Sequence, residues 1–172
     1  MFAVNDTILY GLNGACKITD ITKREIGGSA AEYYVLQPVY SNASTIFVPT
    51  GNKNLTGRMR RVLSAAEIYA LIKSMPQEKP VWIEDENQRK EACKEILSNG
   101  DRRELIRLIK ALYLHQKELQ QIGRRLHMSD ERFLKEAERL LYDEFALVLR
   151  IKPDQVLPFI MEQIELEEKA EL

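Results

Sequence analysis

At 172 residues the chain is long enough to bury a core, either as one medium domain or as two small ones. Its composition, 45% hydrophobic and 30% charged, is that of a globular protein, and no apolar run of about 18 residues predicts a membrane span. The two cysteines form no C-x-x-C motif, and with only two histidines beside them they predict no metal site and no cofactor. The start of the chain lacks the basic and apolar segments of a secretion signal, so we expect a reduced, cytoplasmic protein.

The net charge of −1 conceals an uneven distribution. Residues 1–75 contain 8 Lys and Arg against 5 Asp and Glu, and residues 87–139 contain 13 against 9. Residues 140–172 reverse the balance, with 3 basic against 8 acidic residues. A basic middle and an acidic end indicate an anionic partner for the middle of the chain.

Residues 1–62 have the pattern of a small β module. Runs rich in β-branched and aromatic residues predict strands over residues 4–10, 15–24, 32–40 and 45–49. Short strands at this spacing predict a small barrel or a strongly bent sheet of four or five strands. An open edge of such a sheet can accept a strand from a partner, and Lys23 and Arg24 would flank it with positive charge.

From Ser64 onward the sequence is helical. The run Ser64-Ala65-Ala66-Glu67 is a capping box and predicts a helix to about Lys73. The next segment, SMPQEKPVWIEDENQ at 74–88, holds two prolines and is the predicted domain linker. Four helices are predicted after it: one at 87–98 that stops at Asn99-Gly100, one starting at Asp101, one capped by Ser129 and one starting at Pro153. We therefore predict an α+β protein with a β module at 1–62, a helix and linker at 63–79 and an all-helical domain at 80–172.

Motifs of catalysis are missing from the sequence, which contains no P-loop, no G-x-G-x-x-G and no G-x-S-x-G. His115 and His127 have no Ser or Cys beside them and are interpreted as surface histidines. We expect no enzymatic activity, and only a deep pocket with converging carboxylates would revive an enzyme hypothesis.

Basic residues of the helical half are better organised. Four of them share one face of the helix that starts at Asp101, opposite its leucines: Arg103, Arg107, Lys110 and Lys117. Others lie on the helices before and after it and in the connection between them: Arg89, Lys90, Lys94, Arg124, Arg125, Arg132, Lys135 and Arg139. Two interpretations stay open. One is a solvated surface on which glutamates pair with these cations at i,i+4 spacing, and the other is a phosphate-contacting surface with steep salt dependence.

Trp82 is the single tryptophan and stands in the predicted linker. One interpretation makes it a plug between domains. The other makes it an exposed apolar wedge, of the kind that minor-groove proteins insert at an unstacked base step.

Several stretches together resemble a known family: FAVNDTILYGLNGACKITDI, then YYVLQP, then IFVPTGN with TGRMRRVLS, and later LIRLIKALY and AERLLYDEFAL. Their order and spacing resemble the CarD/CdnL family of bacterial transcription regulators over nearly the whole chain. In that comparison Asn5-Asp6 corresponds to the family's Gly-Asp, Asn13-Gly14 to its His-Gly, and Val48-Pro49 to its Val-Pro.

This resemblance implies a Tudor-like N-terminal β-barrel, similar to the polymerase-interacting domain of transcription-repair coupling factor, that docks on the β subunit of RNA polymerase by edge-strand pairing. It implies that the helical domain touches promoter DNA, without sequence specificity, at the upstream edge of the bubble and holds the bubble open. The contacts predicted from it are, for the polymerase, Arg24, Ile46, Phe47, Val48 and Pro49, and for DNA, Trp82, Arg89, Lys90, Arg103 and Arg107.

The chain departs from the family at two positions. Arg24 matches one polymerase-contacting arginine, but the second falls on Phe47, so an ionic contact would be lost there. The family's wedge tryptophan falls on Glu86 rather than on Trp82. The competing hypothesis is a protein-interaction adaptor whose helices oligomerise and do not bind DNA; the sequence leaves the oligomeric state open, with a monomer as the expectation.

Overall fold

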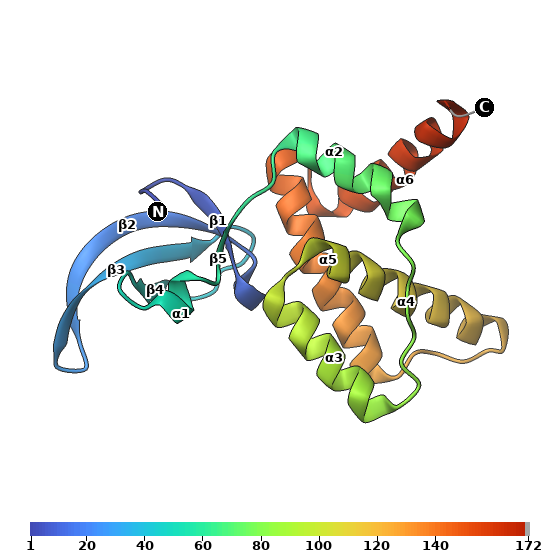
Figure 1. Ribbon diagram of the computed structural model, residues 1–172, viewed down its shortest axis with the longest axis horizontal. Coiled ribbons are helices and arrows are strands. Elements are labelled where there is room, and N and C mark those ends of the chain that lie inside the picture. The colour runs from blue at the N-terminus through green and yellow to red at the C-terminus, as the bar shows by residue number, and fades with distance from the viewer. Residues whose placement is uncertain (171–172) are drawn as a thin grey trace. The chain divides into compact units, whose positions relative to one another are not determined.

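The computed structural model describes residues 1–170 and divides the chain into two compact units, residues 1–63 and 64–172 (Figure 1). The first is an antiparallel sheet with little helix, and the second is all-helical. The α+β class and the order of the two parts are therefore as predicted.

Five strands build the first unit, in the spatial order β4-β3-β2-β1-β5. Their bounds are β1 Thr7–Tyr10, β2 Ala15–Ile26, β3 Ser29–Pro38, β4 Ile46–Pro49 and β5 Met59–Arg61. The longest pair, β2 and β3, forms a curved hairpin closed by Gly27 and Gly28, whose φ angles of 64° and 80° suit a two-residue turn between twisted strands (Figure 1). The register shifts between Ile18 and Asp20, and such a bulge bends a sheet.

The predicted barrel is wrong in one respect, because the sheet is not closed. Each of β4 and β5 pairs with one neighbour, β3 and β1 respectively, and over residues 1–63 no pairing joins the two. The sequence interpretation also missed β5 and the short helix α1, Lys53–Thr56, which Asn52 caps through its side chain. A three-residue strand has too few residues to show an alternating pattern.

The core of this unit lies on one face of the sheet. Its buried members are Ile8, Cys16, Ile18, Tyr34, Leu36, Val48 and Met59. Alternate residues of β3 and β4 therefore point inward, which leaves the intervening residues on the other face.

Five longer helices form the second unit: α2 Ala65–Ser74, α3 Glu86–Asn99, α4 Arg102–Gln121, α5 Met128–Leu149 and α6 Pro153–Ala170. The predicted caps at Ser64, Asp101 and Gly100 are confirmed: both side chains accept an amide hydrogen bond from a residue of the first turn, and Gly100 is left-handed at φ 66°. The predicted cap at Ser129 is wrong. His127 occupies the N-cap position, and the Ser129 hydroxyl is buried without a hydrogen-bond partner among the described residues.

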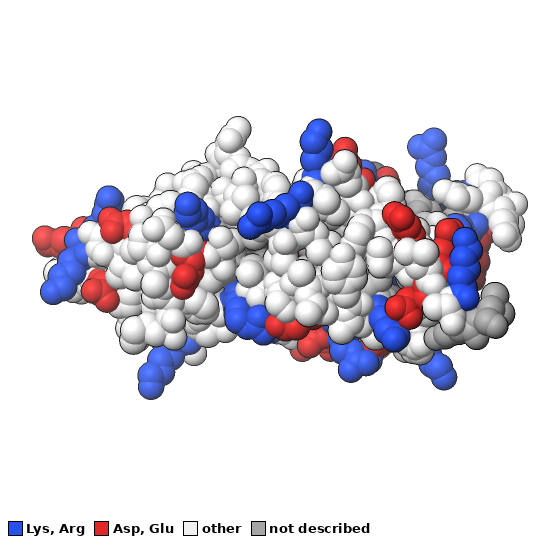
Figure 2. All heavy atoms as spheres, turned by 90° about the horizontal axis from the view of Figure 1, so that it is seen from above, with Lys and Arg blue, Asp and Glu red and all other residues white. Residues whose placement is uncertain are grey.

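Helix α5 is the centre of this unit, since it contacts α2, α3, α4 and α6. One buried cluster lies between α3, α4 and α5 and includes Cys93, Leu97, Leu112, Leu134 and Ala137. Acidic and basic side chains are interspersed over the face of the molecule seen in Figure 2.

The predicted linker is not a spacer between the two units. Residues 74–85 lie inside the second unit, between α2 and α3, and include a short 3-10 helix at Met75–Gln77. Met75 and Glu78 in this segment are buried. Its two prolines interrupt the helices, but Met75, Glu78 and Trp82 attach the segment to the helical unit.

Candidate functional site

The β4 edge is the first candidate surface. This strand pairs only with β3, in the register Val35 to Phe47 and Tyr34 to Val48, so its other side offers backbone groups to a partner strand. Pro49 ends the strand, and its ring nitrogen has no hydrogen to donate.

Arg24 and Phe47 come together on the face of the sheet that is turned away from the core. The Arg24 guanidinium carbon lies 4.8 Å from the centre of the Phe47 ring. Tyr33 adds an edge-to-face contact with Phe47, at 6.4 Å between ring centres. We call Arg24, Tyr33 and Phe47 the Arg24–Phe47 surface. Tyr33 was not predicted from the sequence as part of this surface. Tyr33 and Tyr34 are adjacent, and the sequence does not show which of the two rings faces away from the core.

Ile46 and Val48 point the other way. Val48 is fully buried, and Ile46 packs against the same core. Their predicted contact with a partner is therefore restricted to the backbone of the edge, whereas the side chains of Phe47 and Pro49 remain on the outer face.

In the helical unit, basic residues on one face of α4 bind an acidic residue of the same unit, Glu78. Glu78 is 5% exposed and accepts a hydrogen bond at 2.7 Å from the Nε of Arg103 and another at 2.7 Å from the Nε of Arg107. Lys110 donates from its Nζ to the backbone carbonyls of Met75 and Glu78. Three of the four cations predicted on this face thus bind segment 75–78 to α4.

The electrostatics of this contact follow from its geometry. The hydrogen bonds from Arg107 and Arg103 hold the pKa of Glu78 below its ordinary value of 4.5. Burial lowers the pKa of Lys110. The side chains of Arg103 and Arg107 keep exposed fractions of 63% and 49%, so their outer nitrogens still face solvent.

Arg89, predicted from the sequence as a DNA contact, lies in the interior of the helical unit. Its side chain is buried and forms two hydrogen bonds with the carboxylate of Asp130, at 3.0 and 2.9 Å, which join α3 to α5. A third nitrogen donates to the carbonyls of Ile83 and Glu84. A phosphate could reach Arg89 only by displacing these partners, so this residue is not carried into the DNA surface proposed below.

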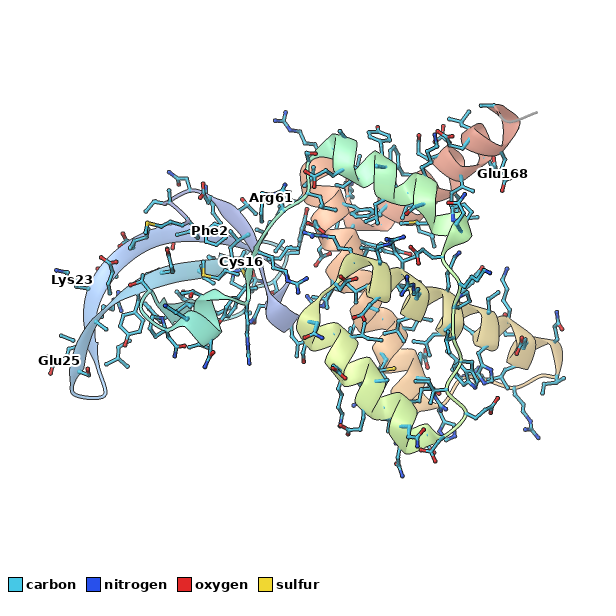
Figure 3. All side chains as sticks on the ribbon, in the orientation of Figure 1. Phe2, Cys16, Lys23, Glu25, Arg61 and Glu168 are labelled. Atoms are coloured by element: carbon cyan, nitrogen blue, oxygen red, sulfur yellow. The ribbon has the colours of Figure 1, made fainter. Side chains whose placement is uncertain are left out.

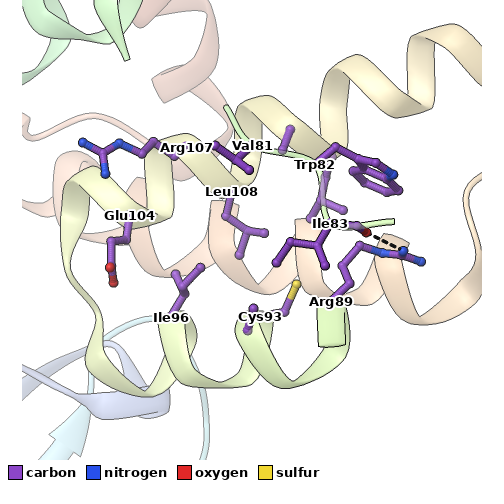
Figure 4. Close-up of a pocket in the computed structure, with 12 residues that line it drawn as sticks. Val81, Trp82, Ile83, Arg89, Cys93, Ile96, Glu104, Arg107 and Leu108 are labelled. Atoms are coloured by element: carbon purple, nitrogen blue, oxygen red, sulfur yellow. Dashed lines mark hydrogen bonds between the residues drawn. The ribbon is translucent and has the colours of Figure 1, made fainter. Parts of the chain in front are cut away.

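Two side chains pack against the ring of Trp82. The His115 ring stacks on it at 3.8 Å, and the Arg89 guanidinium lies 4.5 Å from its centre. It also packs against the buried cluster of α3, α4 and α5, and it forms one wall of a hollow of about 240 Å³ whose other walls include Cys93, Ile96 and Leu108 (Figure 4). An indole held in this way is not free to enter a base step, so the wedge prediction for Trp82 is not pursued.

Other predicted residues divide between the interior and the surface. Lys90 is partly exposed and pairs with Glu86, four residues before it, at 3.0 Å. Both cysteines are buried, and burial raises the pKa of the Cys93 thiol to about 11. Within residues 1–170 no group of three His, Cys, Asp or Glu side chains could hold a metal ion, and no helix is long and apolar enough to cross a membrane.

A comparison with protein families decides what the first unit is. The model of the CarD-like/TRCF RID domain family matches residues 2–63, and the match ends where the first compact unit ends. Residues 2–63 are a CarD-like/TRCF RID domain. The resemblance found in the sequence is thereby confirmed for this unit, and it makes the protein a transcription-related one whose partner is RNA polymerase.

The lowered pKa of Glu78 predicts a pH-dependent contribution to stability. A carboxylate whose folded-state pKa lies below its unfolded-state pKa stabilises the fold fully above the unfolded value of 4.5, and this contribution is lost as the pH falls through the folded value. Glu78→Gln should therefore lower the melting temperature at neutral pH and reduce its decline between about pH 5 and pH 3. Thermal unfolding across this range tests it. The exposed control Glu91→Gln should leave the profile almost unchanged, and an equal effect of both variants would contradict the role of Glu78.

The Arg89–Asp130 pair predicts a large cost of removing its carboxylate. Asp130→Asn would leave the guanidinium buried without its counter-charge, which typically costs about 3–5 kcal/mol. The exposed pair Lys94–Glu91 gives a matched control, because Lys94→Ala should cost at most about 1 kcal/mol. Chemical denaturation followed by circular dichroism measures both. A small loss for Asp130→Asn would mean that Arg89 is tolerated without a partner.

Proposed function

We propose that this protein is a non-catalytic, sequence-nonspecific regulator of transcription initiation that acts in the cytoplasm. In this proposal the RID domain binds the β subunit of RNA polymerase, and the helical unit contacts promoter DNA near the upstream edge of the bubble and stabilises the open complex. The family match of residues 2–63 is the observation that carries it.

The β4 edge supports the manner of binding. A short strand that is paired on one side can extend a sheet of the partner through main-chain hydrogen bonds, and side chains beside it then give specificity. Arg24 provides a charge for an acidic residue of the polymerase. Phe47 holds this arginine by a cation–π contact and offers an apolar surface where the family has a second arginine.

The charge of the helical unit supports the DNA half of the proposal. Residues 87–139 carry 13 basic against 9 acidic residues. The outer nitrogens of Arg103 and Arg107 are available for phosphates, as is the partly exposed Lys90. Contacts of this kind bind the backbone of DNA and carry no base specificity.

The adaptor hypothesis also has an observation in its favour. Helix α6 exposes Leu157, Met161 and Leu166 with exposed fractions of 46%, 53% and 53%. Such residues could bind another protein or a second copy of the chain.

Arg24→Glu is expected to weaken binding of the full-length protein to the isolated lobe region of polymerase β. The substitution reverses the charge on the outer face of β2 and removes the contact with Phe47, but it leaves the core of the sheet unchanged. Lys23→Glu is the matched control. Lys23, labelled in Figure 3, precedes Arg24 in β2, and consecutive residues of a strand point to opposite faces. Biolayer interferometry gives both affinities. Equal affinities of the wild type and Arg24→Glu would remove Arg24 from the interface.

The DNA half is tested by binding of the full-length protein to a duplex that contains a bubble, over a series of salt concentrations. We expect affinity that falls steeply as salt rises, because each phosphate contact releases condensed counterions. Absence of binding even at low salt, together with a molecular mass that rises with protein concentration, would favour the adaptor instead.

A further inference from the structure

Most cations of the helical unit are already paired within it. Glu78 binds Arg103 and Arg107, and other carboxylates bind Arg89, Lys90, Lys94, Arg102, Lys135 and Arg139. Lys110 binds backbone carbonyls, and Lys117 lies over the Tyr113 ring. A paired cation has part of its charge neutralised, so it attracts a phosphate less strongly than an unpaired one.

Three arginines near one another in sequence differ from these. Arg124 and Arg125 lie in the connection between α4 and α5, and Arg132 lies in the first turns of α5. All three are exposed, and within residues 1–170 none has an ion pair or a side-chain hydrogen bond. Three positive charges therefore remain uncompensated over nine residues.

Two of the most exposed apolar side chains of the helical unit flank the same arginines. Ile122 is 66% exposed and Met128 is 78% exposed. The connection that carries them is ordered by contacts of its own: Leu126 is buried in the core, and the backbone N–H groups of Gly123 and Arg124 donate to carbonyls of the last turn of α4. The connection therefore has a defined conformation in which the side chain of Ile122 is exposed. This side chain takes no part in the buried core.

We propose that the α4–α5 connection, residues 122–132, is the principal DNA-binding surface of the helical unit. Arg124, Arg125 and Arg132 would bind phosphates, and Ile122 and Met128 would contact sugars and base edges in the minor groove. The inference rests on the proposed function, and it moves the main contact from the face of α4 to the end of that helix.

The chemistry of the surface favours DNA over a lipid membrane. All of its unpaired cations are arginines, the residue type that narrow minor grooves attract. Its apolar part consists of two side chains separated by basic residues, which matches the small apolar insertions of minor-groove proteins. A membrane-binding segment would instead present a long apolar helix face.

The test uses the full-length protein and fluorescence anisotropy with a 20-base-pair duplex and a bubble duplex, over a salt series. Arg124→Ser/Arg125→Ser should reduce the slope of log affinity against log salt by about 2, and it should weaken binding at low salt roughly tenfold or more. Ile122→Ser should weaken binding without changing the slope, because it removes no phosphate contact. Circular dichroism verifies that each variant is folded.

Arg150→Asn/Lys152→Ser is the matched control. Both residues carry an exposed, charged side chain that has no partner among the described residues, and they follow the opposite end of α5. Asn suits the left-handed conformation of position 150, where φ is 57°. This control removes the same charge, so an equal loss of affinity would show that only total charge matters and would overturn the proposed surface.

The outcomes separate this inference from the proposed function. If the wild type binds neither duplex at low salt, the DNA half of the proposed function fails and the inference fails with it. If the wild type binds and Arg124→Ser/Arg125→Ser keeps its slope while Arg103→Ser/Arg107→Ser loses it, the inference is overturned and the proposed function stands. Sedimentation of the wild type with phosphatidylglycerol vesicles, without binding to either duplex, would overturn the inference in favour of a lipid surface.

Discussion

Buried carboxylates that bind arginines are the constraint on which the helical unit depends. Asp130 and Glu144 on the central helix α5 bind Arg89 of α3 and Arg102 of α4, in both cases through two hydrogen bonds. Glu78 accepts one hydrogen bond from each of Arg103 and Arg107, and these bonds attach segment 75–78 to α4. A buried charge is stable only with its partner, so these contacts fix where the helices lie. They also decide which cations remain for an external anion.

The RID domain depends on a different constraint, the incomplete pairing of its sheet. A closed barrel would have no edge, whereas this open sheet keeps β4 paired on one side only. Alternation along β4 then separates two tasks. Val48 fixes the strand to the core, and Phe47 faces outward and contacts Arg24. The outer face of the sheet thus presents one cation held by an aromatic ring.

The proposed function assigns a different kind of recognition to each of the two units. Strand pairing with side-chain contacts is specific and depends little on salt, which fits a single protein partner such as RNA polymerase. Contacts between arginines and phosphates are nonspecific and depend strongly on salt, which fits many promoters. Covalent connection of the two would place weak DNA contacts at high effective concentration beside the polymerase, so that neither contact has to be strong alone.

The sequence alone determined the features that depend on local chemistry. These include strands β1 to β4, the caps at Ser64, Asp101 and Gly100, and the resemblance that the RID match confirms. It could not determine which side chains meet across the fold. Arg89 and Asp130 are 41 residues apart in the chain, and nothing in either neighbourhood predicts their contact. Only the tertiary structure left the sheet open and packed other side chains against the ring of Trp82. It also paired some basic residues and left Arg124 and Arg125 without a side-chain partner in residues 1–170. These outcomes depend on long-range packing and burial rather than on local pattern.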